Sequence, residues 1–180
     1  MALRPNPSLE TAIRSRVARV AVGPSTVRGN PRGTAEAARR ALRALPLRTF
    51  SVRNAGAFAG ALDRATARIR SELPAGGQRW GVARKVLNIY LRDCVYSAHL
   101  RSVYNLGRVE AYCEVPLDSI TAKRLRAAKQ GAELPLWPGV RNLTPQVSAQ
   151  YQAVAAEIGK ASRVKRVHLD VFWWSKERDT

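Results

Sequence analysis

The segment from about residue 81 to residue 100 constrains the fold most, because it is apolar around most of a helical circumference. At about 100° per residue, its main polar residues fall within one arc roughly 100° wide; these residues are Arg84, Lys85, Asn88, Arg92 and His99. Two residues break the pattern, since Val95 lies inside the polar arc and Asp93 lies on the apolar side. A helix of this kind is largely buried. We therefore expect it at the centre of the fold, with its polar stripe facing water, a cleft or a ligand.

Lys85 lies at the edge of this stripe, next to Ile89. Partial removal from water would lower the pKa of its ammonium group and free an amine nucleophile. The like charges of Arg84 and Arg92 would lower that pKa further. A basic helix face in contact with solvent is the plainer interpretation, and the sequence leaves both open.

Helical spacing and capping residues recur along the rest of the chain. They predict helices over residues 8–20, 35–45, 54–72, 119–129 and 145–161, beginning after residues such as Ser8, Thr34 and Thr144. The run 167–174 is apolar and rich in β-branched or aromatic residues, which predicts a strand or an extended packing segment. We therefore expect a mainly α fold over residues 1–180, as a single helical domain or as two lobes, with a hairpin and the central helix at about 73–100.

The chain is strongly basic, with 31 Lys and Arg against 13 Asp and Glu and a net charge of +18. This excess favours a polyanionic partner such as DNA, RNA or an anionic membrane surface. GC-rich coding explains the preference for arginine over lysine, but not the shortage of acids. No apolar run reaches the roughly 18 residues of a membrane span, and no signal peptide is evident. We expect a cytoplasmic monomer.

Cys94 and Cys113 are the only cysteines. Two thiols are too few for a structural zinc site or an iron–sulfur cluster without other ligands. We expect them to be reduced core residues, while a single disulfide stays open. In a strand, His168 and Asp170 would share a face, but with two histidines in the chain a metal site is disfavoured. We expect no metal and no cofactor.

A glycine-bearing turn precedes the central helix, with Gly76 and Gly77 in the connection and Gly81 near the start of the helix. Backbone N–H groups at such a turn, together with the helix dipole, can bind a DNA phosphate. On this interpretation Arg84, Asn88, Arg92 and, in the loop 23–33, Arg28 would be further DNA contacts. Ordinary turn chemistry and a basic surface loop are the alternatives.

Asp118 follows Lys85 by 33 residues and precedes a predicted helix. Its position predicts an N-cap, whose carboxylate the helix dipole and N–H groups hold ionised. Such a carboxylate can also stabilise a cationic sugar or orient a water or an amine. The capping role and the chemical role are compatible.

These two segments resemble the helix-hairpin-helix DNA glycosylase superfamily. Trp80-Gly81-Val82-Ala83-Arg84-Lys85-Val86-Leu87-Asn88 resembles the hairpin that the endonuclease III and 8-oxoguanine glycosylase branches follow with a catalytic lysine. Val115-Pro116-Leu117-Asp118-Ser119 resembles that superfamily's Pro-Val-Asp-Thr segment, whose aspartate is essential. Ala83 stands in place of the second hairpin glycine, and the cysteine cluster of endonuclease III is absent. The pattern also resembles a group of bacterial proteins of unknown function.

The resemblance implies a helix-hairpin-helix glycosylase-like helical bundle that acts on double-stranded DNA. It gives Lys85 the role of Schiff-base nucleophile and Asp118 that of catalytic carboxylate, in the excision of a damaged or modified base with or without strand cleavage by lyase chemistry. Aromatic side chains could stack on the extruded base or fill the gap it leaves, although core packing is their plainer role; the candidates are Trp80, Tyr90, Trp137, Trp173 and Trp174.

Two other functions stay open. The first is a non-enzymatic basic protein that binds DNA or RNA through the same hairpin. The second is an interaction protein whose basic charge reflects only the composition of its genome.

Overall fold

The computed structural model describes residues 7–176, and this part of the chain is mainly helical, without a β-strand. The α-helices are α1 (Pro7–Ala21), α2 (Thr34–Arg43), α3 (Ala55–Glu72), α4 (Trp80–Tyr96), α5 (Ala98–Val103), α6 (Ser119–Ala127), α7 (Pro145–Ala161) and α8 (Leu169–Lys176). Short 3-10 helices are η1 (Leu47–Phe50), η2 (Leu106–Arg108), η3 (Lys129–Gly131), η4 (Val140–Asn142) and η5 (Arg166–His168). The expectation of a mainly α fold is confirmed, whereas the glycosylase-like bundle stays a prediction.

Side-chain caps explain where several of these helices begin. Asn54 accepts a hydrogen bond from the Ala57 amide at 2.8 Å, and Thr144 accepts one from the Val147 amide at 3.3 Å ahead of Pro145. These caps satisfy first-turn amides that have no partner within the helix. Thr34 differs from its predicted role, because Gly33 is the cap residue of α2 and the Thr34 hydroxyl donates to the Pro31 carbonyl at 2.7 Å.

The central helix is shorter than its apolar pattern predicts. Helix α4 ends at Tyr96, because Ser97 adopts an extended backbone and its hydroxyl caps the next helix by accepting from the Leu100 amide at 3.4 Å. The predicted helix over 81–100 is therefore two helices, α4 and α5, with a break at Ser97.

The C-terminal segment corrects the expectation of a strand. Residues 166–168 form η5 and the chain continues directly into α8, which lies against α6. A short apolar run does not distinguish a buried strand from a helix, and here packing on α6 decides the outcome. His168 and Asp170 consequently do not share a strand face, and their side chains bind different partners.

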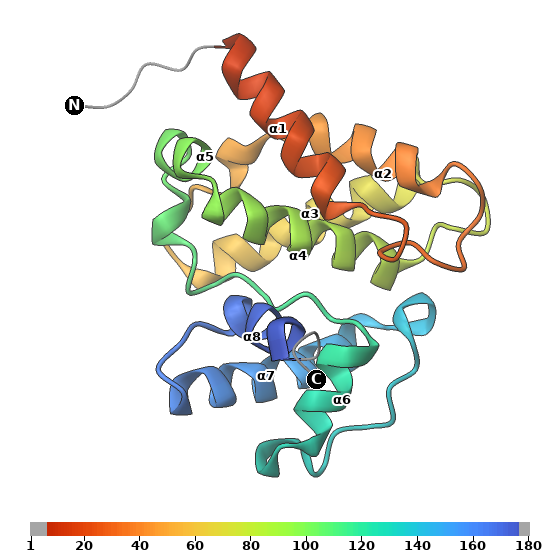
Figure 1. Ribbon diagram of the computed structural model, residues 1–180, viewed down its shortest axis with the longest axis vertical. Helices are drawn as coiled ribbons and strands as arrows, with labels where there is room; N and C mark the ends of the chain where they lie inside the picture. Colours follow the sequence, from red (N-terminus) through yellow and green to blue (C-terminus); the bar gives the residue numbers. More distant parts are fainter. Residues whose placement is uncertain (1–6, 177–180) are drawn as a thin grey trace.

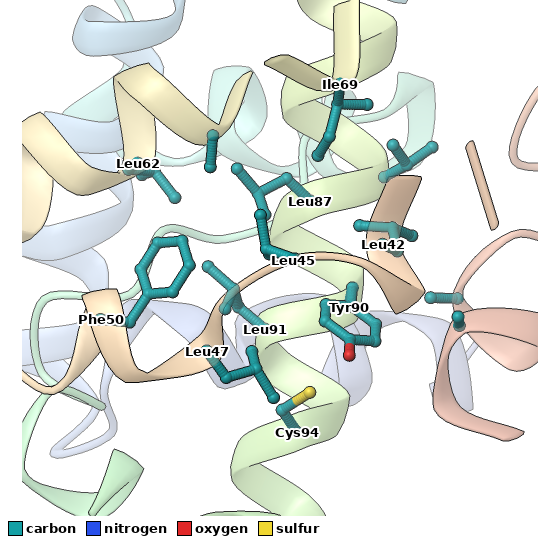
Figure 2. Close-up of a cluster of buried hydrophobic side chains, with 14 of the residues drawn as sticks. Leu42, Leu45, Leu47, Phe50, Leu62, Ile69, Leu87, Tyr90, Leu91 and Cys94 are labelled. Atoms are coloured by element: carbon teal, nitrogen blue, oxygen red, sulfur yellow. The ribbon is translucent and has the colours of Figure 1, made fainter. Parts of the chain in front are cut away.

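The helices gather in two groups, as Figure 1 shows: α1–α5 lie together in one, and α6–α8 lie together in the other. Each group has its own cluster of buried apolar side chains. Figure 2 shows part of the larger cluster, in which Leu87, Tyr90 and Leu91 of α4 pack among residues of α2, α3 and η1. Cys94 and Cys113 are free thiols buried in this cluster.

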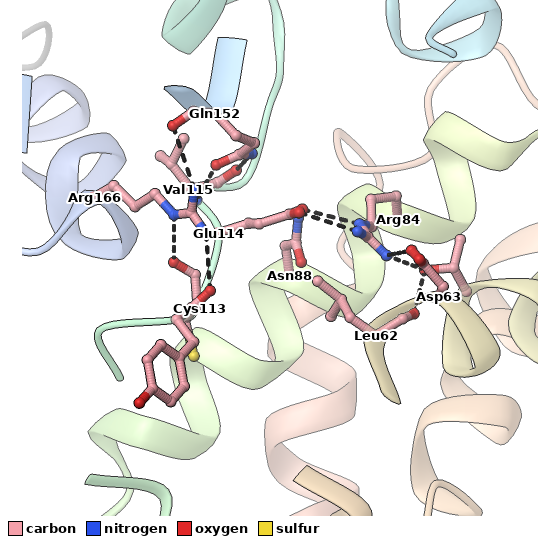
Figure 3. Close-up of polar contacts among 11 residues, drawn as sticks. Leu62, Asp63, Arg84, Asn88, Cys113, Glu114, Val115, Gln152 and Arg166 are labelled. Atoms are coloured by element: carbon pink, nitrogen blue, oxygen red, sulfur yellow. Dashed lines mark hydrogen bonds and ion pairs between the residues drawn. The ribbon is translucent and has the colours of Figure 1, made fainter. Parts of the chain in front are cut away.

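The chain crosses from the first group to the second between η2 and α6, and polar side chains clamp this crossover from both sides (Figure 3). Gln152 of α7 bonds both the amide and the carbonyl of Val115, at 3.0 and 2.8 Å. Arg166 donates to the Tyr112 and Cys113 carbonyls at 2.9 and 3.0 Å. From the side of α4, Arg84 binds Glu114 through both carboxylate oxygens. The position of Asp118, just beyond this clamp, is thereby fixed relative to α4.

Candidate functional site

A pocket of about 1130 Å³ lies where the two helix groups meet. One wall comes from the end of α1, the following loop and α4; the opposite wall comes from the start of α6, the segment around η4 and the start of α8. Its charged and aromatic lining residues are Arg28, Lys85, Arg92, Asp118, Trp137, Arg141 and Asp170. Apolar residues, among them Ile89, Ile120 and Val171, line the space between them.

Lys85 projects from α4 into this pocket, one residue after the buried Arg84. Its ammonium group donates to the Thr26 carbonyl at 3.4 Å. Burial lowers the pKa of Lys85, and the negative charge of Asp118 acts in the opposite direction. The expectation that Arg84 and Arg92 would lower the pKa of Lys85 further is wrong, because neighbouring carboxylates neutralise both guanidinium groups. Removal from water alone therefore favours the free amine.

Asp118 is the N-cap of α6, as its position in the sequence predicts. Its Oδ1 accepts a hydrogen bond from the Thr121 amide at 2.9 Å, and the residue also lines the pocket. The amide and the helix N-terminus both stabilise negative charge at this point. The pocket thus holds a carboxylate that is fixed in place at a helix N-terminus.

The fold brings Lys85 and Asp118 to the same pocket from opposite helix groups. An amine that is partly removed from water is a nucleophile, and a nearby carboxylate can accept its proton or stabilise developing positive charge. This pair therefore has the components for attack on an electrophilic carbon that becomes cationic as its bond to a leaving group breaks.

Arg92 and Asp170 form a second charged pair in the pocket. Arg92 is ion-paired with Asp170 of α8 and, through Nε at 2.9 Å, with Asp93 on its own helix. Burial raises the pKa of Asp170 to about 6; the Arg92 charge acts against this shift, while the Asp118 charge reinforces it. Arg92 was expected to contact DNA, but its guanidinium is bound by two carboxylates.

Arg84 and Asn88 need correction as DNA contacts, because both are buried and bound to Glu114 (Figure 3). Arg84 donates to Glu114 from Nε at 2.9 Å and from Nη2 at 3.0 Å, and Asn88 donates to the same carboxylate at 2.9 Å. Arg84 also reaches Asp63, Thr66 and the ring face of Trp80. To reach a phosphate, either side chain would have to break bonds that hold the crossover.

The glycines also differ from their predicted roles. Gly81 lies inside the first turn of α4 and is buried, and an added Cβ would lie 2.1 Å from the Val140 carbonyl oxygen. Gly77 is likewise buried against Pro31 and Thr34. Gly76 is exposed with a φ of 78°, a backbone conformation that favours glycine. Gly77 and Gly81 thus allow close packing rather than present backbone amides to a ligand, and none of the three lines the pocket.

The five aromatic candidates differ in whether they line the pocket. Trp137 lines the pocket, and its ring packs edge-on against that of Tyr151, with 5.4 Å between the two ring centroids. Tyr90 is fully buried in the larger core cluster (Figure 2), which excludes it from contact with a ligand. Trp80 and Trp173 pack against the smaller cluster and do not line the pocket. The side chain of Trp174 lies outside the described residues.

The sequence did not point to Glu114, and it gave Asp170 the wrong neighbour. Glu114 was missed, although a buried arginine on an apolar helix implies a carboxylate partner. Nothing in the sequence indicates which of the 13 acids that partner is. Asp170 was considered only beside His168, which instead binds Glu110 at 2.9 Å and stacks on Tyr96. The helical form of this segment was the missing information.

At the rim of the pocket, Arg28 and Arg141 are exposed. Residues 7–176 contain no group of three or more His, Cys, Asp and Glu side chains that could bind a metal. In the same range, no helix combines the length and apolar character needed to cross a membrane.

No protein-family model matches this chain, and no curated protein or solved structure matches it.

Proposed function

We propose that the protein is a DNA glycosylase that excises a damaged or modified base, with Lys85 and Asp118 as its catalytic pair. The observation that carries this proposal is that both side chains line one pocket, although they lie 33 residues apart in the sequence and belong to different helix groups. The net charge of +18 and the exposed Arg28 and Arg141 at the rim favour a polyanionic ligand.

The pocket suits an extruded nucleotide in size and in lining. A volume of about 1130 Å³ slightly exceeds the usual range for small-molecule sites, which is about 300–1,000 Å³. Trp137 offers an aromatic ring, and Ile89 and Ile120 offer apolar surface for a flat base. Extrusion of a base costs a few kcal/mol, and the cost is least for a damaged or mismatched base.

In the proposed reaction the neutral Lys85 amine attacks C1′ of the sugar. A bond forms between Nζ and C1′ while the glycosidic bond breaks, and its electron pair leaves with the base, which is protonated from solvent. Asp118 stabilises the cationic sugar in the transition state and accepts the proton that the attacking nitrogen loses. Opening of the sugar ring then gives a Schiff base, which water hydrolyses or which undergoes β-elimination. Because burial lowers the pKa of Lys85, the amine is available at lower pH than an exposed lysine would be.

The test is base release from duplex oligonucleotides that each carry one oxidised purine, alkylated base or uracil. Lys85→Gln and Asp118→Asn should each abolish release, while Lys123→Gln, at an exposed position on α6, should keep it. Full activity in both pocket variants would exclude this catalytic pair. Loss of activity in Asp118→Asn alone would instead assign Lys85 to phosphate binding and Asp118 to activation of water, which is glycosylase chemistry without a lyase step.

The same samples test the non-enzymatic alternative. Binding of undamaged duplex should weaken as salt rises, and Arg28→Ala should lower the slope of log affinity against log salt by about 1. Arg64→Ala, on the exposed side of α3, should not change that slope. Salt-sensitive binding without base release from any substrate would favour a nucleic-acid-binding protein that is not an enzyme.

A further inference from the structure

The two ends of the pocket differ in charge along its α4 wall. Lys85 lies at one end and Arg92 at the other, and at about 1.5 Å per residue the helix separates them by about 10 Å along its axis. Ile89 lines the wall between them. Arg92 is ion-paired with Asp93 and Asp170, which cancel its positive charge. The Arg92 end of the pocket therefore carries no excess of positive charge.

Two arginines line the pocket near its Lys85 end, one from each wall. The Lys85 ammonium donates to the Thr26 carbonyl at 3.4 Å, which holds the loop that carries Arg28 beside this end. On the other side Gly81, one turn before Lys85, packs so closely on η4 that an added Cβ would lie 2.1 Å from a carbonyl oxygen of that turn. Arg141 belongs to η4, so this contact fixes its backbone at the same end of α4.

The guanidinium groups of these two arginines are available to a ligand. Both residues are exposed, and in the part of the chain that the structure describes, residues 7–176, neither Arg28 nor Arg141 forms an ion pair or a side-chain hydrogen bond. Asp118 influences the pKa values of both Lys85 and Asp170, so its carboxylate lies between the two ends. A guanidinium without a carboxylate partner keeps all its donors, and its planar fork matches two oxygens of a phosphate.

We propose that Arg28 and Arg141 bind the two phosphates that flank the extruded nucleotide, one arginine to each phosphate. The inference deepens the proposed function and rests on it for the identity of the ligand as DNA. The sugar between the two phosphates then lies beside Lys85, and the base extends along Ile89 toward the end without excess charge. Such contacts fix the position of C1′ without reading the sequence.

The test measures binding of the full chain to a duplex with one tetrahydrofuran abasic site, in which either flanking phosphate is replaced by an uncharged methylphosphonate. Each replacement should weaken binding by wild-type protein about tenfold, the effect of one hydrogen bond to a charged group. Arg28→Ala and Arg141→Ala should each bind the unmodified duplex about tenfold more weakly. Each variant should also become insensitive to one replacement, a different one for each, because a contact cannot be lost twice.

A control variant and the base-release assay separate this inference from the proposed function. Arg64→Ala, on the exposed side of α3, does not line the pocket and should keep both sensitivities. Losses that add up in either arginine variant, wild-type binding that neither replacement weakens, or no binding of the abasic duplex would overturn the inference. Insensitivity of the expected kind without base release from any substrate would support the two phosphate contacts while the glycosylase proposal fails. Base release with additive losses would do the opposite.

Discussion

Arg84 and Lys85 are neighbours on α4, yet the fold uses their charges in opposite ways. Arg84 is 8% exposed and bound to Glu114, Asp63 and Thr66, so its charge holds the crossover between the helix groups. Lys85 faces the pocket, with a single long hydrogen bond to a carbonyl and a lowered pKa. One turn further along, Asn88 repeats the first pattern, whereas Ile89 lines the pocket.

The basic stripe on α4 is therefore not one functional unit. The side of α4 that meets Glu114 fixes the position of the crossover, and through it the position of Asp118. The side that carries Lys85 faces the space that results. A structural ion pair on one side of the helix therefore helps to set the geometry of the proposed catalytic pair on the other.

Replacing Arg84 and Lys85 in turn by methionine should change stability very differently. Arg84→Met leaves the largely buried Glu114 carboxylate without its main partner, which should lower the free energy of unfolding by about 3–5 kcal/mol. Lys85→Met removes an ammonium that burial already disfavours, so stability should change by less than about 0.5 kcal/mol. Urea unfolding measures both variants. Equal losses would show that the two sides of α4 do not differ in the way described.

A smaller effect, dependent on pH, is expected at Asp170 in the pocket. Its pKa is raised from 3.8 to about 6, so between these values the folded chain keeps a proton that the unfolded chain has released. Its contribution to stability is complete below about pH 4 and is lost as the pH rises to 6. Asp170→Asn should therefore gain about 2–3 kcal/mol relative to wild type between pH 4 and 7. A stability difference between wild type and Asp170→Asn that stays constant over this pH range would contradict the raised pKa of Asp170.

Gly81 tests the packing of α4 on η4, which forms part of the pocket wall. An added Cβ would lie 2.1 Å from the Val140 carbonyl oxygen and 2.7 Å from the Leu143 Cβ, so Gly81→Ala should destabilise the fold by about 2 kcal/mol. Gly56→Ala is the matched control, because its Cβ would meet Asn54 at an ordinary 3.6 Å. Thermal unfolding compares them. A Gly81→Ala variant with unchanged stability would mean that η4 moves aside freely.

The smallest effect on stability separates the two roles of Asp118. Asparagine is as good an N-cap as aspartate, so Asp118→Asn should keep stability within about 0.5 kcal/mol, whereas Asp118→Ala should lose about 1 kcal/mol. Both variants should lose the proposed activity, since neither carries the charge. Comparable stability in Asp118→Ala and wild type would remove the capping role seen in the hydrogen bond to Thr121.

Local signals were sufficient for much of the fold. The Thr144-Pro145 pair predicted the start of α7, and apolar spacing predicted a buried α4, because both depend on neighbours within a few residues. The break at Ser97 and the helical form of 169–176 could not be predicted, since the first needs a side-chain cap to outweigh a continuing apolar pattern and the second depends on packing against α6.

The candidate site was predictable in its motif residues and not in its partners. Lys85 and Asp118 were chosen from local context, and the fold places both in the pocket. Glu114 and Asp170 act through contacts with residues 30 and 78 positions away, which spacing along the chain does not reveal. The pairing of a charged stripe is a property of tertiary structure, so Arg84 and Asn88 were assigned to the wrong partner.

Borohydride trapping on duplex DNA that carries a substrate base decides whether Lys85 is the nucleophile, because reduction fixes a Schiff base only where an amine has attacked C1′. A covalent complex is expected with wild-type protein and with Lys123→Gln, and none with Lys85→Gln. Trapping of Lys85→Gln to the wild-type level, or base release by wild-type protein without any trapped complex, would exclude Lys85 as the nucleophile.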